Sequence, residues 1–321
     1  MNPSVANLID SITFGEQQTY RNMSIIPLFH NNGDKLTYKM LSDSVKNKVV
    51  EITEISDSGH VPELKVINHS ENRVLIVDGE QFIGAKQNRV INATVLLEAK
   101  STTIINVACV EQGRWNYSKN RNFEDSEHLM NYEIRSQRMA SVSENLKMSK
   151  RFHADQSEVW ENVASFSRKA EVHSPTMAME DVYTNKMNII NDYKNEFKLA
   201  ENQKGMVIFI NGEIAGIEYL SSADGFASIS EKLINSYSST AIFDNKDFKA
   251  VDLTDKCKDF LNYIKYGYEG QYKSVGLGED IRYESQAGYA SALVHESEVV
   301  HFVAVKLSNE RDIVKPQRFI R

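Results

Sequence analysis

Polar side chains gather in two short clusters between residues 77 and 115, within a stretch that is otherwise rich in β-forming residues. The first cluster comprises Lys86, Gln87, Asn88 and Arg89, and the second comprises Glu111, Gln112, Arg114 and Trp115. Arginine presents a planar fork that suits phosphate or carboxylate, and lysine adds a compact positive charge. Amide side chains can contact the edges of a base, and an indole ring can stack on its face. Together these residue types predict a site for a phosphorylated nucleotide.

Two glutamates, Glu80 and Glu111, are the candidates for acid–base chemistry in this stretch. Two positioned carboxyl groups can donate and accept the protons of a reacting bond. The alternative is structural, because both glutamates could form ion pairs with Arg89 and Arg114 that tie two strands together. If the two clusters form one site, Arg89 and Arg114 should approach one another across neighbouring strands and face a shared cleft.

The other chemical motifs are weaker. Cys109 lies in an apolar run, IINVACV, which favours a buried thiol over a nucleophile. No cysteines or histidines have metal-ligand spacing, so we expect no metal site. The segment GLGED at 276–280 lacks the spacing of a Walker or Rossmann loop, and we expect no bound cofactor. Glu279 and Arg282, in and just after this segment, are candidates to complete the ligand site.

The composition is that of a soluble globular protein, with 41% hydrophobic and 25% charged residues among 321. The formal net charge of −7 disfavours nucleic acid and anionic membranes as partners, because both require a basic face. The N-terminus lacks the basic and apolar segments of a signal peptide, and no apolar run reaches the roughly 18 residues of a membrane helix. We therefore expect a cytoplasmic protein, with a homo-oligomer as the base-rate expectation.

The spacing of apolar residues changes twice along the chain and predicts three parts. Residues 1–122 hold short β-type runs separated by turns, which is typical of a β-sandwich. Residues 123–203 have helical spacing, and residues 204–321 alternate strands with helices. The prediction is an α+β fold with an N-terminal β-sandwich-like part, a helical middle and a C-terminal α/β part with antiparallel hairpins.

Local signals place some elements more closely. Ser126 is the expected cap of a helix that runs through Met139, and Asp155 or Ser157 the expected start of a second helix. Asn211-Gly212 predicts a two-residue hairpin turn, since this dipeptide tolerates the two positive φ angles of a type I′ turn.

The chain resembles the ARPP family, a domain named for its association with ADP-ribosylglycohydrolases and rhodanese-phosphatases. The segments that carry the similarity are LKVINHSENRVLIVDGEQFIGAKQNRVINATVLLEAKSTTIINVACVEQGRW, GMVIFINGEIAGIEYL, GLGEDIRYES and ASALVHESEVVHFVAV. The similarity extends from about Leu36 to Val305, and GAKQNR and EQGRW are its most specific motifs. It implies a role in the metabolism of NAD-derived and ADP-ribose-type nucleotides, including systems of bacterial and phage conflict, but no particular reaction.

Three hypotheses for the function follow. In the first, the protein binds an NAD-derived or other phosphorylated nucleotide as a sensor or sequestering protein, which requires the cationic and aromatic groups alone. In the second, it is a hydrolase or transferase that acts on the N-glycosidic or phosphoester bond of an ADP-ribose-like nucleotide, with Glu80 and Glu111 as the acid–base pair. In the third, it is a structural or interaction protein without a ligand. The sequence leaves open whether the protein is an enzyme.

Overall fold

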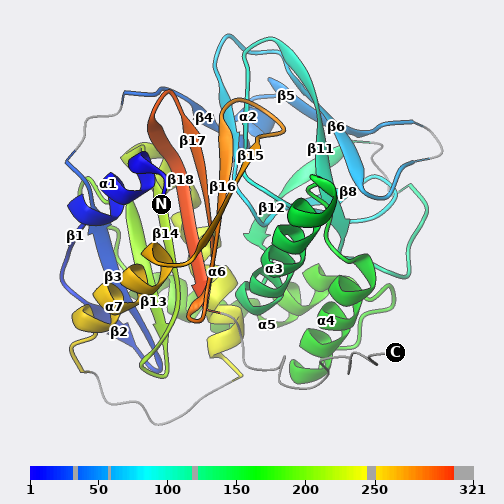
Figure 1. Ribbon diagram of the computed structural model, residues 1–321. Coiled ribbons are helices and arrows are strands. Elements are labelled where there is room, and N and C mark those ends of the chain that lie inside the picture. Colours follow the sequence, from blue (N-terminus) through cyan, green and yellow to red (C-terminus); the bar gives the residue numbers. More distant parts are fainter. Residues whose placement is uncertain (32–34, 57–58, 118–121, 244–250, 307–321) are drawn as a thin grey trace, which may run out of the picture.

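The C-terminal part of the chain and the N-terminal strands build one large antiparallel sheet (Figure 1). The computed structural model describes residues 1–31, 35–56, 59–117, 122–243 and 251–306. The strands of this nine-stranded sheet are β1 (Thr13–Phe14), β2 (Gln18–Tyr20), β3 (Met23–Phe29), β13 (Gly205–Ile210), β14 (Glu213–Leu220), β15 (Tyr268–Lys273), β16 (Glu279–Ser285), β17 (Gly288–His295) and β18 (Glu298–Lys306). Their order is β1-β3-β13-β14-β18-β17-β16-β15, with β2 beside β3.

The hairpins of this sheet confirm the predicted C-terminal part. Asn211 and Gly212 join β13 to β14 with φ angles of 53° and 73°. Glu296 and Ser297 join β17 to β18 with φ angles of 52° and 64°. Positive φ at both central residues is what a type I′ turn requires, because its backbone twist matches that of the flanking strands.

Helices cover both faces of the large sheet. α1 (Pro3–Ser11) and α7 (Thr254–Lys265) lie on one face, where Leu8, Phe260 and Phe302 belong to one apolar core. α6 (Ala223–Ala241) lies on the other face and contributes Phe226 and Leu233 to a second core. That second core also contains residues of the N-terminal strands, so α6 is packed between the sheet and the rest of the molecule.

The N-terminal part is sandwich-like, as predicted. Its strands are β4 (Lys39–Met40), β5 (Val50–Glu54), β6 (Glu63–Asn68), β7 (Val74–Ile76), β8 (Glu80–Gly84), β9 (Arg89–Ile91), β10 (Val95–Leu97), β11 (Ser101–Cys109) and β12 (Phe123–Leu129). They form a six-stranded sheet, β12-β8-β9-β11-β6-β5, and a three-stranded sheet, β10-β7-β4. The two sheets and the short helix α2 (Leu41–Lys46) enclose a core that includes Val66, Ile76 and Leu97.

The helical middle consists of α3 (Tyr132–Ser149), α4 (Gln156–Lys169) and α5 (Met179–Glu196). Asp155 caps α4 by accepting from two backbone N–H groups, which confirms one of the two predicted starts. The prediction of a helix from Ser126 is wrong, because Ser126 lies in β12, which pairs with β8, and Asn131 caps α3 instead. None of the helices in the described ranges is both long and apolar enough to cross a membrane.

A buried ionic network joins the three parts of the molecule. Arg135 of α3 donates from Nε to Asp78 Oδ1 at 2.7 Å and from Nη1 to Glu218 Oε1 at 2.5 Å. Arg138, one turn along α3, donates to the same Asp78 oxygen at 2.7 Å. Tyr237 of α6 donates to Glu218 Oε1 at 2.8 Å. All five side chains are buried, so the two carboxylates and the two guanidinium groups compensate one another in the absence of solvent.

Gly79 allows this network to form. Its φ is +89°, in a region that residues other than glycine rarely adopt. A Cβ atom at this position would lie 2.9 Å from Cδ and Nε of Arg135. The close approach of the backbone to Arg135 therefore requires glycine beside Asp78.

Candidate functional site

The two polar clusters predicted from the sequence lie side by side, at the β8–β9 turn and at the turn that follows β11. Arg114 binds Glu111 through two parallel hydrogen bonds, Nε to Oε1 at 2.8 Å and Nη2 to Oε2 at 2.7 Å. Its Nη1 also donates to the carbonyl of Ala85 at 2.7 Å. The backbone N–H of Asn88 donates to Glu111 Oε2 at 3.1 Å. These contacts fasten the two turns to each other.

Arg89 and Lys86 lie against aromatic rings instead. Arg89 is fully buried, its Nη1 donates to Gln87 Oε1 at 2.8 Å, and its guanidinium carbon lies 5.5 Å from the ring centre of Trp115. Lys86 Nζ lies 5.4 Å from the Trp115 ring and 5.2 Å from that of Tyr117. Both distances fall within the range of cation–π attraction, so Trp115 covers two cations of the first cluster.

The two arginines do not face a shared cleft. Arg114 lines a cavity of about 400 Å³ together with Asn88 and Glu111, whereas Arg89 is absent from its lining. Gln112 is exposed, and its carbonyl accepts from Gln87 Nε2 at 3.4 Å.

The C-terminal candidates lie elsewhere, on β16. The exposed Glu279 accepts from Gln271 at 2.6 Å, and the buried Arg282 pairs with Asp280 at 2.9 Å between Nη2 and Oδ2. The structure therefore places the two N-terminal clusters together but not Glu279 and Arg282 with them.

Glu111 is held as a carboxylate in this arrangement. Burial alone would raise its pKa, but the hydrogen bonds from Arg114 and from the Asn88 N–H outweigh burial and lower it. We expect Glu111→Gln to lower the free energy of unfolding by about 1–3 kcal/mol, because Arg114 loses a charged partner. Chemical denaturation checks this, with Glu124→Gln as the control on an exposed residue of the same cavity. Unchanged stability together with lost activity would instead support the acid–base role predicted for Glu111.

A larger groove, with a volume of about 810 Å³, lies between β12, α2, α5 and α6. Lys232 of α6 and Asp125 of β12 line it, and Lys232 Nζ lies 2.7 Å from both carboxylate oxygens of Asp125. Lys232 also lies 3.6 Å from Oε1 of Glu80, which is buried behind it on β8. The groove therefore contains one lysine placed between two carboxyl groups.

Burial raises the pKa of Glu80. Loss of solvent, together with the nearby Asp125 carboxylate, raises its pKa to about 7 against the opposing effect of Lys232. Its second oxygen, Oε2, accepts from the backbone N–H of Val77 at 2.7 Å. Near neutral pH, Glu80 thus exchanges between a neutral acid and a carboxylate.

This ionisation should be visible in stability. Between pH 4.5 and 7, folded Glu80 keeps a proton that the unfolded chain has released, so raising the pH lowers the free energy of unfolding. Glu80→Gln has no carboxyl group to titrate, so its free energy of unfolding should fall less between those pH values. The difference between the two proteins should reach up to about 3 kcal/mol. Urea titrations of both proteins at several pH values measure the difference. Parallel pH dependences would contradict a protonated Glu80 in the folded state.

Glu180, in the first turn of α5, is the second carboxyl group of this region with a raised pKa. Its Oε2 accepts from Gln81 Nε2 at 2.5 Å and from Ser126 Oγ at 3.2 Å. Burial raises the pKa of Glu180 to about 7, although 21% of its side chain remains exposed to the smaller cavity. Glu180 lines the cavity of about 400 Å³, and its partner Ser126 lines the groove of about 810 Å³. The hydrogen bond between them therefore marks the boundary between the cavity and the groove.

A neutral histidine faces Glu180. His128 Nε2 lies 3.7 Å from Glu180 Oε1, and the imidazole stacks on the ring of Tyr183 with centroids 4.5 Å apart. Burial, reinforced by the positive charges of Lys232 and Lys194, lowers the pKa of His128 to about 4. A neutral imidazole leaves Oε1 of Glu180 without a cationic partner at this position, which is consistent with the raised pKa of that carboxyl group.

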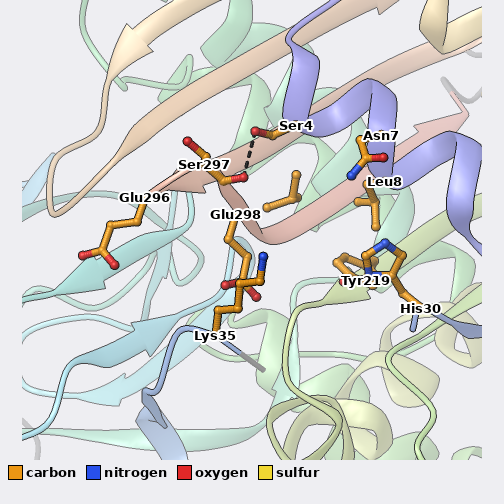
Figure 2. A pocket seen from close by; sticks show the side chains of 10 residues that line it. Ser4, Asn7, Leu8, His30, Lys35, Tyr219, Glu296, Ser297 and Glu298 are labelled. Carbon is orange, nitrogen blue, oxygen red and sulfur yellow. Dashed lines mark hydrogen bonds between the residues drawn. The ribbon is translucent and has the colours of Figure 1, made fainter. Parts of the chain in front are cut away.

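Two further observations narrow the choice of site. A cavity between α1 and the β17–β18 turn, lined by His30 and Tyr219 among others, is only about 110 Å³ in volume (Figure 2). That volume is well below the roughly 300 Å³ at which ligand pockets begin. His30 already contacts Ser11 Oγ at 2.9 Å and Tyr219 Oη at 3.3 Å. Within the described ranges, no three His, Cys, Asp or Glu side chains are placed to hold a metal ion.

Sequence reasoning missed Asp125, His128, Glu180 and Lys232. They come from β12, α5 and α6, and no short motif links them. The one local signal is Lys232, a cation beside apolar residues in the α6 sequence SEKLINSY. A charge that interrupts an apolar helix face indicates a buried partner.

The fold and the two cavities define a mixed α+β protein with two glutamates of raised pKa, Glu80 beside Lys232 and Glu180 beside His128. The model of the ARG and Rhodanese-Phosphatase-superfamily-associated Protein domain matches residues 11–305. Because this match spans most of the 321 residues, the chain belongs to that family, as the resemblance predicted. No curated protein and no solved structure matches the chain.

Proposed function

We propose that the groove along β12, together with the adjoining smaller cavity that Glu180 lines, is the active site of a hydrolase or transferase that acts on the N-glycosidic or phosphoester bond of an ADP-ribose-like nucleotide. The observation that carries this proposal is Glu180, a partly exposed carboxyl group with a pKa of about 7 at the boundary of two cavities. General acids and bases work best when their pKa lies near the working pH, and burial is the usual means of raising a glutamate to that value.

Three side chains have a role in this proposal. Protonated Glu180 donates its proton to the leaving group, and the resulting carboxylate accepts a proton from the attacking water or acceptor hydroxyl. Lys232 provides a positive charge for a phosphate of the substrate. Glu80, buried behind Lys232, positions that lysine and does not contact the substrate. The sequence predicted an acid–base role for Glu111. That role remains the alternative, and the Glu111→Gln variant described above tests it.

A binding protein is the second candidate. Three lysines, Lys46, Lys194 and Lys232, line the same groove and could hold a phosphorylated nucleotide without converting it. In that case the protein is a sensor or sequestering protein for an NAD-derived metabolite. A role in bacterial and phage conflict, which the family resemblance implies, is compatible with both candidates.

Incubation with a panel of NAD, ADP-ribose and cyclic nucleotides separates the two candidates. The protein is denatured afterwards, and the small molecules are identified by mass spectrometry. The enzyme proposal predicts a converted nucleotide, and it predicts that Glu180→Gln leaves that nucleotide intact. If the wild-type protein retains a nucleotide and releases it unchanged on denaturation, the result favours the binding protein. If neither conversion nor retention occurs for any member of the panel, both candidates are wrong for this class of ligand.

A further inference from the structure

A second cavity, part of whose wall is apolar, adjoins the groove of the proposed active site. Its volume is about 330 Å³, and it lies where β2, β3 and β13 meet α5 and α6. Its apolar walls are Ile25, Phe197, Leu199, Met206, Phe226 and Ile234. A cavity of this size with aromatic and aliphatic walls falls within the range that binds small molecules.

The loop that closes this cavity is held in place by two amide side chains. Gln18 of β2 exchanges two hydrogen bonds of 2.7 Å with the backbone N–H and carbonyl of Lys198. Gln203 accepts from the N–H of Ala200 at 3.0 Å and donates to the carbonyl of Gly205 at 2.8 Å. Because both amides are bonded to backbone, the loop is fixed and the cavity is preformed, with its apolar side chains beside the charged group of Lys194.

The apolar cavity and the groove share three residues, Lys194, Ala227 and Glu231. On α6, Ser230 and Ile234 line the apolar cavity, whereas Ser228 and Lys232 line the groove. One helix therefore forms the boundary of both.

An ion pair marks this boundary. Lys194 of α5 lies 3.3 Å from Glu231, and the Glu231 side chain is 72% exposed. An exposed ion pair contributes little to stability, so a ligand anion can replace Glu231 at Lys194 at small cost.

We propose that the apolar cavity binds an aromatic ring of the same molecule whose phosphate lies in the groove, with that anionic group at Lys194, which lines both cavities. This inference rests on the proposed function, because it assigns a second part of the substrate to a subsite next to the same groove. It defines the ligand class as a ring joined to phosphate, long enough to extend across α6 from one cavity to the other.

Binding of 1-naphthyl phosphate, measured by isothermal titration calorimetry, tests the subsite without turnover. Leu199→Glu places a negative charge on a wall residue that is 48% exposed. Ile189→Glu is the matched control on α5, since Ile189 is 41% exposed and belongs to the lining of neither cavity. We expect Leu199→Glu to weaken binding by about tenfold or more and Ile189→Glu to leave it unchanged. Lys194→Ala should weaken naphthyl phosphate and leave 1-naphthol unaffected.

Equal affinity of the wild-type protein and Leu199→Glu for naphthyl phosphate would overturn the subsite, as would binding of inorganic phosphate as tight as that of the naphthyl ester. Failure of the proposed function has a different signature. If Glu180→Gln leaves nucleotide conversion unchanged while Leu199→Glu still weakens the naphthyl ester, the ring subsite stands and the acid–base assignment falls. If instead Glu180→Gln abolishes nucleotide conversion and Leu199→Glu leaves binding of the naphthyl ester unchanged, the active site stands and the subsite is wrong.

Discussion

Replacement of Glu218 by alanine is expected to lower the free energy of unfolding by about 3–5 kcal/mol, a large share of the roughly 5–15 kcal/mol by which folded domains are stable. Glu218 accepts from Arg135 and from the Tyr237 hydroxyl inside the core, and His301 Nε2 lies 3.7 Å from its other oxygen. Without this carboxylate, Arg135 keeps Asp78 as its acidic partner but shares it with Arg138. One positive charge is then left uncompensated where no solvent reaches it.

Chemical denaturation and the yield of folded protein measure this effect. Lys258→Ala is the control, because Lys258 pairs with Asp255 on the surface at 3.2 Å with 57% and 94% of the side chains exposed. Exposed pairs of this kind contribute about 0–1 kcal/mol. Similar losses of stability in Glu218→Ala and Lys258→Ala would show that the buried network does not join the parts of the molecule.

Replacement of Glu180 by glutamine is expected to lower kcat by about 10²–10⁴-fold for the nucleotide that the protein converts, because an amide cannot take or give the proton. The fold should survive, since the amide of the substituted side chain would keep an oxygen that can accept from Gln81 and Ser126. Substrate affinity should change little, because the proposed cations for the anionic groups of the substrate are Lys232 and Lys194.

Glu196→Gln is the control for this prediction. Glu196 is an exposed residue at the other end of α5 that lines neither cavity, and the same change of charge there should leave kcat within about twofold. Two results would refute the assignment of Glu180: equal losses of kcat in both variants, or a full rate in Glu180→Gln.

Local signals in the sequence were reliable where one residue type decides a backbone conformation. Asn211-Gly212 formed the predicted hairpin turn, and Asp155 formed the predicted helix cap, because both depend on neighbours in the chain. Ser126 failed because pairing of β12 with β8, a tertiary contact, outweighed the helical spacing that continues to Met130 and beyond. Sequence spacing carries no information about a strand partner so far away.

The site was predictable only in part, for the same reason. GAKQNR and EQGRW were correctly predicted to lie next to each other, because GAKQNR joins β8 to β9 and EQGRW follows β11, which pairs with β9. The environment of Glu80 depends on Lys232, and that of Glu180 depends on His128 and Ser126, which lie on other elements. The raised pKa values arise from burial, which no local pattern of charged residues records.

The most direct test of the central claim is a titration of Glu180 by carbon-13 NMR of the glutamate carboxyl groups, comparing the wild-type protein with Glu180→Gln. Glu80 titrates in the same range, so the signal of Glu180 is identified as the one missing from the variant. The proposed active site predicts that this signal titrates with a pKa of about 7. If the wild-type signal that is absent from Glu180→Gln titrates near 4.5, the ordinary pKa of glutamate, Glu180 is a carboxylate at neutral pH and has no role as a general acid.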